Sequence, residues 1–341
     1  MLHGKSSIRG NDLTWDRVDV DALDCIAVNV AVLLERVGVQ DIRTPFAAEW
    51  HFSFEPRSHE AQLLLGRSPL QDLVAQHTRC TVREHRLSDD GGLSTDLARL
   101  ADEGPTLLFG DAYYMPWLPY ANKQHMEHSV ILAAVDDQNA AIVDAYSIRT
   151  EWGDARPTAT TVPVDCLVES INSLKSARRK IAWSIQKGSE NAGQSIDRVL
   201  YANVENILQA LDAKHAMRTF ATYYADHATD PELLQTFALD CWLITRARQI
   251  HARWLADLAR KSSGVISATV AEAFENAIVR PWQTASEFSY IAFRRAKGGR
   301  SPPDTSFKLI MNQIEPAEID MAKLIRRELP RQSFATHFGL A

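Results

Sequence analysis

A cysteine near the start of the chain lies where a helix is predicted to begin. In LDCIAVNVAVLLERVG (residues 23–38), the apolar residues from Ile26 onward recur at helical spacing. Asp24 is a predicted N-cap and Gly38 a predicted C′ residue. Cys25 then lies in the first turn, where free backbone N–H groups and the helix dipole favour a thiolate. Such a thiol is either a nucleophile or a small side chain that only packs.

A nucleophilic cysteine needs a base and a group that orients the base, and residues 110–146 contain both types. Two apolar runs, residues 130–135 and 141–146, flank the turn DDQN and are predicted to pair as an antiparallel hairpin. Positions whose numbers sum to about 275 then face each other. His128 and Asp144 sum to 272, so they are predicted neighbours across this hairpin. A carboxylate among apolar residues needs a partner, and imidazole is the obvious one.

The order of cysteine, strand histidine and strand aspartate is the papain-like order. With the motifs DC, LLERVG, DAYYMPWLPY, HSVILAAVDD, VDAY and VPVDCLVESI, residues 21–174 resemble the butirosin biosynthesis protein H family. The resemblance implies an α+β fold: a papain-like N-terminal domain, followed by a mostly helical C-terminal domain. It further implies a Cys-His-Asp triad of Cys25, His128 and Asp144.

Members of that family are acyltransferases or related thioester-handling enzymes of natural-product pathways. The resemblance therefore implies that Cys25 takes an acyl group from the phosphopantetheine of an acyl or peptidyl carrier protein. A small-molecule amine, or water in a thioesterase, then receives the group. No other cofactor is expected. His128 would serve as the base in both steps, and Asp144 would fix its tautomer.

Two other functions stay open on the sequence. A papain-like peptidase or amidase is one, but such enzymes usually place a Gln ahead of the cysteine for the oxyanion, and no Gln precedes Cys25. The other is a non-catalytic partner of an assembly-line enzyme, although a scaffold needs none of the three residues. The helical region could supply a lid, an acceptor pocket or a homodimer interface.

An aromatic, proline-containing loop precedes the strand that carries His128. Its residues Tyr113, Tyr114, Trp117 and Tyr120 are predicted either to wall a substrate cleft or to pack under the loop. His125 lies three residues before His128, but no third ligand stands at a recognised spacing, so no metal site is predicted. We expect His125 to line the cleft or to face solvent.

A basic cluster follows the predicted helix over residues 162–180. Lys175, Arg178, Arg179 and Lys180 could receive an acidic carrier protein through charge complementarity. Equally, such a run is typical of a solvated helix end, where the dipole favours cations.

Composition excludes several classes of protein. The 341 residues carry a formal net charge of −6, which argues against nucleic acid as a partner. No apolar run is long enough for a membrane span, and the first residues show no export signal. The four cysteines, at positions 25, 80, 166 and 241, form no CxxC pair. Together these features predict free thiols and a cytoplasmic protein.

The distribution of helix and strand signals divides the chain in two. Residues 1–185 mix predicted strands and helices, whereas strand signals fade beyond residue 195. The stretch QKGSENAGQS (residues 186–195) is the predicted linker. Residues 196–341 form the predicted helical domain, with a long helix that begins at Asp230-Pro231, where N-cap and N1 chemistry stand in order.

Overall fold

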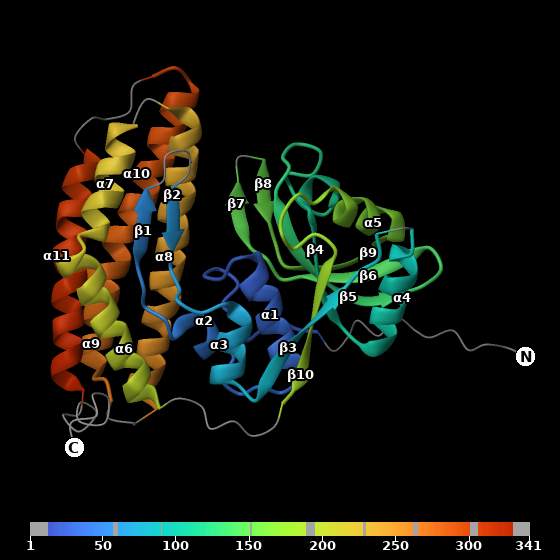
Figure 1. Cartoon of the computed structure of the whole chain (residues 1–341), viewed down its shortest axis with the longest axis horizontal. Helices are drawn as coiled ribbons and strands as arrows, with labels where there is room; N and C mark the ends of the chain where they lie inside the picture. The colour runs from blue at the N-terminus through green and yellow to red at the C-terminus, as the bar shows by residue number, and fades with distance from the viewer. Residues whose placement is uncertain are drawn as a thin grey trace, which may run out of the picture. The chain divides into compact units, whose positions relative to one another are not determined.

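The chain is a mixed α/β protein with a helical C-terminal region, and it divides into two compact units (Figure 1). The computed structural model describes residues 13–56, 61–89, 91–150, 152–188, 195–227, 230–261, 265–300 and 306–329. Unit 1 comprises residues 1–45 and 70–192, and unit 2 comprises residues 46–69 and 193–341.

Unit 1 is built on a six-stranded sheet in which every neighbouring pair is antiparallel. In spatial order its strands are β3 (Cys80–Arg86), β10 (Ile181–Lys187), β4 (Thr106–Asp111), β5 (Glu127–Val135), β6 (Asn139–Asp144) and β9 (Thr158–Pro163). The strands β4 and β6 are almost wholly buried, so their sequences are mostly apolar and do not alternate between apolar and polar residues. A separate small hairpin joins β7 (Ile148–Thr150) to β8 (Gly153–Ala155).

Helices of unit 1 pack on this sheet. They are α1 (Cys25–Arg36), α3 (Leu70–His77), α4 (Leu93–Glu103) and α5 (Val164–Ser173), with the short 3-10 turn η2 (Ala112–Tyr114) after β4. The apolar stripe Leu93, Leu97 and Leu100 turns α4 towards the core. Helix α1 is buried from Ala27 to Leu34, which explains its continuous run of apolar residues. The short α2 (Thr44–Ala47) crosses the boundary between the units.

Unit 2 is a group of helices with one β-hairpin packed on them. The helices are α6 (Ile196–Leu208), α7 (Ala216–Asp226), α8 (Pro231–Arg260), α9 (Ala268–Phe274), α10 (Arg280–Lys297) and α11 (Ser306–Glu328), with π-helical turns η3 (Gln209–Ala213) and η4 (Glu275–Val279). The predicted start of α8 is confirmed, since Asp230 caps it and Pro231 is its first residue. The hairpin β1 (Ser53–Pro56) and β2 (Ala61–Leu64) comes from the first part of the chain.

A buried carboxylate connects this hairpin segment to the helices. Glu318 of α11 forms a bidentate ion pair with Arg248 of α8, at 2.9 and 3.0 Å, and both side chains are fully buried. The indole N–H groups of Trp50 and Trp282 also donate to Glu318, at 3.2 and 2.7 Å. Arg248 donates a further bond to the carbonyl of His51. Residues just before β1 are therefore part of the core of unit 2.

The structure corrects two sequence expectations. The predicted division assigned residues 1–185 to one domain, but residues 46–69 within that range pack with unit 2. The helix predicted over residues 162–180 ends at Ser173, because the chain must turn there to enter β10 between β3 and β4. Lys180 takes a left-handed conformation (φ 62°) at that entry. Most of the predicted linker 186–195 lies outside the described residues.

Helix length and hydropathy bear on membrane insertion. Within the described ranges, no helix combines the length and the apolar character that a bilayer span requires.

Candidate active site

Helix α1 begins at Cys25, and its cap confirms the predicted start. One carboxylate oxygen of Asp24 accepts hydrogen bonds from the amides of Ile26 (2.9 Å) and Ala27 (2.8 Å). Cys25 is thereby held at the first position of the helix and is half-buried. Its own amide has no partner among the described residues, so the first turn presents a free N–H beside the thiol.

The hairpin that carries the histidine and the aspartate has the predicted register. Val135 pairs with Ala140 and Ala134 with Ala141, which sum to 275 as expected. A bulge between Leu132 and Ala134 then shifts the register by one residue. Across this hairpin, His128 Nε2 and Asp144 Oδ2 lie 2.8 Å apart, and both side chains are almost fully buried.

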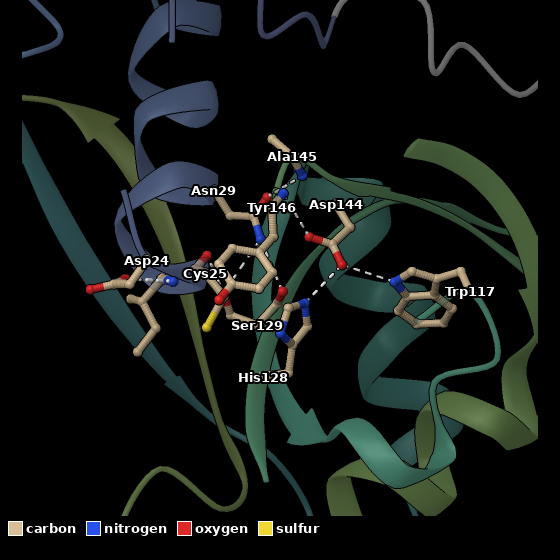
Figure 2. A network of polar contacts seen from close by, with 10 residues as sticks. Asp24, Cys25, Asn29, Trp117, His128, Ser129, Asp144, Ala145 and Tyr146 are labelled. Atoms are coloured by element: carbon tan, nitrogen blue, oxygen red, sulfur yellow. Dashed lines mark hydrogen bonds and ion pairs between the residues drawn. The ribbon is translucent and has the colours of Figure 1, made fainter. Parts of the chain in front are cut away.

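The imidazole of His128 lies between the thiol and the carboxylate (Figure 2). Since Nε2 bonds to Asp144, Nδ1 is the nitrogen that remains for the hydrogen bond with Cys25. Burial lowers the pKa of His128, but the negative charges of Asp144 and of the Cys25 thiolate outweigh it. Together with the hydrogen bonds to both partners, they raise that pKa from 6.5 to about 10. The raised pKa therefore favours the imidazolium form of His128.

Asp144 is held as a carboxylate by three donors. Burial alone would raise its pKa, but the charge of His128 and the hydrogen bonds it accepts lower the pKa below the ordinary 3.8. Besides His128, the donors are the indole N–H of Trp117 (2.9 Å) and the backbone N–H of Tyr146 (3.1 Å). Trp117, predicted either to wall a substrate cleft or to pack under the loop, thus donates to the aspartate.

A buried amide in α1 connects the helix to both strands of the hairpin. Asn29 donates to the carbonyl of Ser129 (2.9 Å) and accepts from the amide of Ala145 (3.0 Å). The hydroxyl of Ser129 donates to the carbonyl of Cys25 at 2.7 Å. These bonds fix Cys25 relative to His128 and Asp144 (Figure 2). The sequence did carry a signal for Asn29, because it is the one amide in an otherwise apolar stretch of the helix.

The other residues predicted to bind substrate separate into two groups. Tyr120 lies edge-on to His128, with ring centres 6.4 Å apart, and is buried. Tyr113 and Tyr114 instead contact His125: the Tyr113 ring stacks on its imidazole at 4.2 Å. His125 Nδ1 lies 2.7 Å from Asp111 Oδ2, so this histidine has a carboxylate partner of its own. Among the described residues, no three metal-binding side chains converge on one point.

The remaining cysteines differ from Cys25 in their surroundings. Cys80 and Cys241 are buried, and Cys166 is half-buried on α5. Burial raises the pKa of all three thiols, and the acidic neighbours Glu169 and Asp165 raise that of Cys166 further. Each is therefore disfavoured as a thiolate.

Comparison with known proteins does not assign the chain to a family. No protein-family model matches the sequence, and neither does any curated protein.

The raised pKa of His128 gives a direct spectroscopic prediction. At pH 8 an ordinary histidine is neutral, whereas His128 should still be an imidazolium and should lose its proton only near pH 10. In Cys25→Ala the midpoint should fall, because the thiolate charge that helps to raise it is gone. Histidine side-chain NMR across pH 5–11 measures both midpoints. A midpoint near 6.5 in the wild type would contradict the ion pair.

The hydrogen bond from Trp117 to Asp144 leads to a prediction about activity. Trp117→Phe keeps the aromatic ring but removes the N–H, so Asp144 loses one of its three donors. We expect kcat/KM for a reaction that uses His128 as the base to fall about tenfold. Trp152→Phe is the matched control, because Trp152 packs near Tyr120 and no indole bond to the site is present. Equal losses in the two variants would refute a role for the Trp117 N–H.

Proposed function

We propose that the protein is a cysteine-dependent acyltransferase that forms an acyl-enzyme at Cys25. One observation carries this proposal: a half-buried thiol at a helix start lies beside a buried histidine, which is in turn bonded to a buried aspartate. This is the arrangement of nucleophile, base and orienting group that nucleophilic catalysis requires. Two of the three residues are almost inaccessible to water, so their geometry is set by the fold.

The same features support a papain-like fold for unit 1 and the resemblance to the butirosin biosynthesis protein H family. The nucleophile opens a helix, and the base and the orienting residue lie on adjacent antiparallel strands later in the chain. A helical region follows, as the resemblance implies.

The proposed reaction has two steps. The Cys25 thiolate attacks the carbonyl carbon of a thioester, a new thioester to Cys25 forms, and the departing thiol takes a proton from His128. In the second step an amine attacks the acyl-enzyme, His128 accepts its proton, and an amide leaves with Cys25 again a thiolate. With water in place of the amine, the product is a carboxylic acid and the enzyme is a thioesterase.

The helix start supports stabilisation of the oxyanion. Asp24 occupies the amides of Ile26 and Ala27, but the amide of Cys25 has no partner among the described residues. It can donate to the oxyanion that forms next to the sulfur, and such a donor contributes about 3 kcal/mol in related enzymes. Attack on a thioester needs less stabilisation of the oxyanion than attack on an amide does. The absence of a Gln ahead of Cys25 therefore argues less against an acyltransferase than against a peptidase.

The test is to incubate the wild-type protein with an acyl thioester of N-acetylcysteamine and to weigh it intact. We expect a mass gain of one acyl group, and peptide mapping should place it on Cys25. Cys166, the other half-buried cysteine, is an internal control and should stay unmodified. Added amines should then remove the label as amides, and hydrolysis without amines would identify a thioesterase. The absence of an acyl-enzyme at Cys25 would refute both.

A further inference from the structure

A polar cavity lies in unit 1, and none of the residues of the proposed triad lines it. Its volume is about 730 Å³, and it lies between the loop after β4 and the turn that follows α5. Asp111, Tyr114 and His125 line one side, and Lys175 and Arg179 line the other. The cavity therefore brings a histidine and two cations together, and nothing in the proposed chemistry at Cys25 uses them.

His125 is held in place although its side chain is 65% exposed. Its Nδ1 bonds to Asp111 Oδ2 at 2.7 Å, and the ring of Tyr113 stacks on it with only 10° between the planes. The edge that carries Nε2 remains for a ligand. Asp111 also accepts hydrogen bonds from the amides of Tyr113 (3.1 Å) and Met126 (3.2 Å). Both oxygens of this carboxylate thus have hydrogen-bond partners within the protein.

Only two members of the basic cluster are available to a ligand. Arg178 pairs with Glu127 at 2.6 Å and lies over the ring of Phe109. Lys180 is buried and donates to the carbonyl of Ser88 and to Asn172. Lys175 and Arg179, in contrast, are exposed, and neither has an acidic partner among the described residues. Both line the cavity, so an anion there would meet two uncompensated charges.

From these contacts we infer that the cavity binds a phosphate ester on the pantetheine arm of the thioester substrate. This rests on the proposed function, with the pantetheine thioester that the family resemblance implies as its substrate. Arg179 suits a phosphate through bidentate hydrogen bonds, and Lys175 adds a further charged donor. The cavity is also close to the triad in the strand register: the pair Asp111–Glu127 is next to Gly110–His128 in β4 and β5. The cavity and the histidine of the proposed triad therefore both lie on unit 1, at the same ends of β4 and β5.

The test compares two probes that differ only in the phosphate. Pantetheine carries none, and the methyl phosphodiester of phosphopantetheine mimics the arm on a carrier protein. By isothermal titration calorimetry, we expect the phosphodiester to bind the wild type at least about tenfold more tightly, since it adds charge-assisted hydrogen bonds. The double variant Lys175→Ala/Arg179→Ala should lose this preference. Arg83→Ala is the matched control, because Arg83 is an exposed arginine of β3 that does not line the cavity.

Coenzyme A distinguishes the two sources of a pantetheine phosphate. Tighter binding of coenzyme A than of the phosphodiester would support the cavity and assign it to the nucleotide-linked arm, and the reverse would assign it to a carrier protein. Equal binding of pantetheine and the phosphodiester by the wild type would overturn the inference. So would an equal loss in Arg83→Ala. These titrations need no turnover, so they separate failure of the cavity from failure of Cys25 to become acylated.

Discussion

Cys25→Ala is expected to lower acyl transfer by at least about 10⁴-fold and to abolish the mass gain on acylation. In the proposed mechanism this sulfur forms the covalent bond of the first step, and no other described thiol combines partial exposure with an adjacent histidine. The measurement is single-turnover transfer from an acyl thioester to an amine, with intact mass as a second readout.

Two further variants make this prediction specific. Cys166→Ala removes the other half-buried cysteine, and it should leave transfer unchanged. His128→Gln should be nearly as damaging as Cys25→Ala, and the double variant no worse than either, because groups that act as a unit have non-additive effects. Acyl transfer by Cys25→Ala at close to the wild-type rate would overturn the proposed role of Cys25, and the absence of transfer by the wild type would favour a non-catalytic binding partner.

The largest expected effect on stability comes from unit 2. Glu318→Ala leaves Arg248 buried without its counter-ion and removes the acceptor of two indole N–H groups. Breaking a buried ion pair in this way costs about 3–5 kcal/mol of unfolding free energy. Urea denaturation measures the loss, and hydrogen exchange followed by mass spectrometry should localise it to α8 and α11.

A surface ion pair on the same helix is the control. Arg326→Ala removes an ion pair to Glu205 that is 42% exposed on both sides, and such pairs contribute at most about 1 kcal/mol. The double variant Arg248→Met/Glu318→Leu should recover part of the stability lost in Glu318→Ala, because no unpaired charge stays buried. If Glu318→Ala proves no worse than Arg326→Ala, the network is not what holds the hairpin segment on the helices.

The parts of the site that follow from local patterns could be predicted from the sequence. The cap at Asp24, the helix from Cys25 and the register of the His128–Asp144 hairpin depend on residues close together in the chain. The bond from Trp117 to Asp144 could not be predicted, because it depends on how the loop before β5 folds back over β6. Similarly, Asn29 was visible as a polar residue in an apolar helix, but its partners lie a hundred or more residues away.

The fold shows the same limit. Residues 162–180 have a continuous helical pattern, but the helix ends at Ser173. The chain beyond it enters β10, which pairs with β3 on one side and β4 on the other. The division between residues 1–185 and 196–341 follows composition, whereas residues 46–69 pack according to distant partners. Glu318, which accepts from Trp50, lies 268 positions further along the chain. No pattern within a short window encodes that contact.

The discontinuous origin of unit 2 has a consequence for how the protein is made. Residues 46–69 leave the ribosome long before Arg248 and Glu318 are synthesised, so Trp50 and the β1–β2 hairpin must wait for their permanent neighbours. During this interval, aromatic side chains that end in a core, Phe52 and Phe54 among them, are exposed to water and to other nascent chains. The sheet of unit 1, in contrast, has all its strands once β10 (residues 181–187) has been synthesised. Unit 2 can be completed only after α11 has been made, and a chaperone that shields the segment 46–69 until then would protect the step most exposed to aggregation.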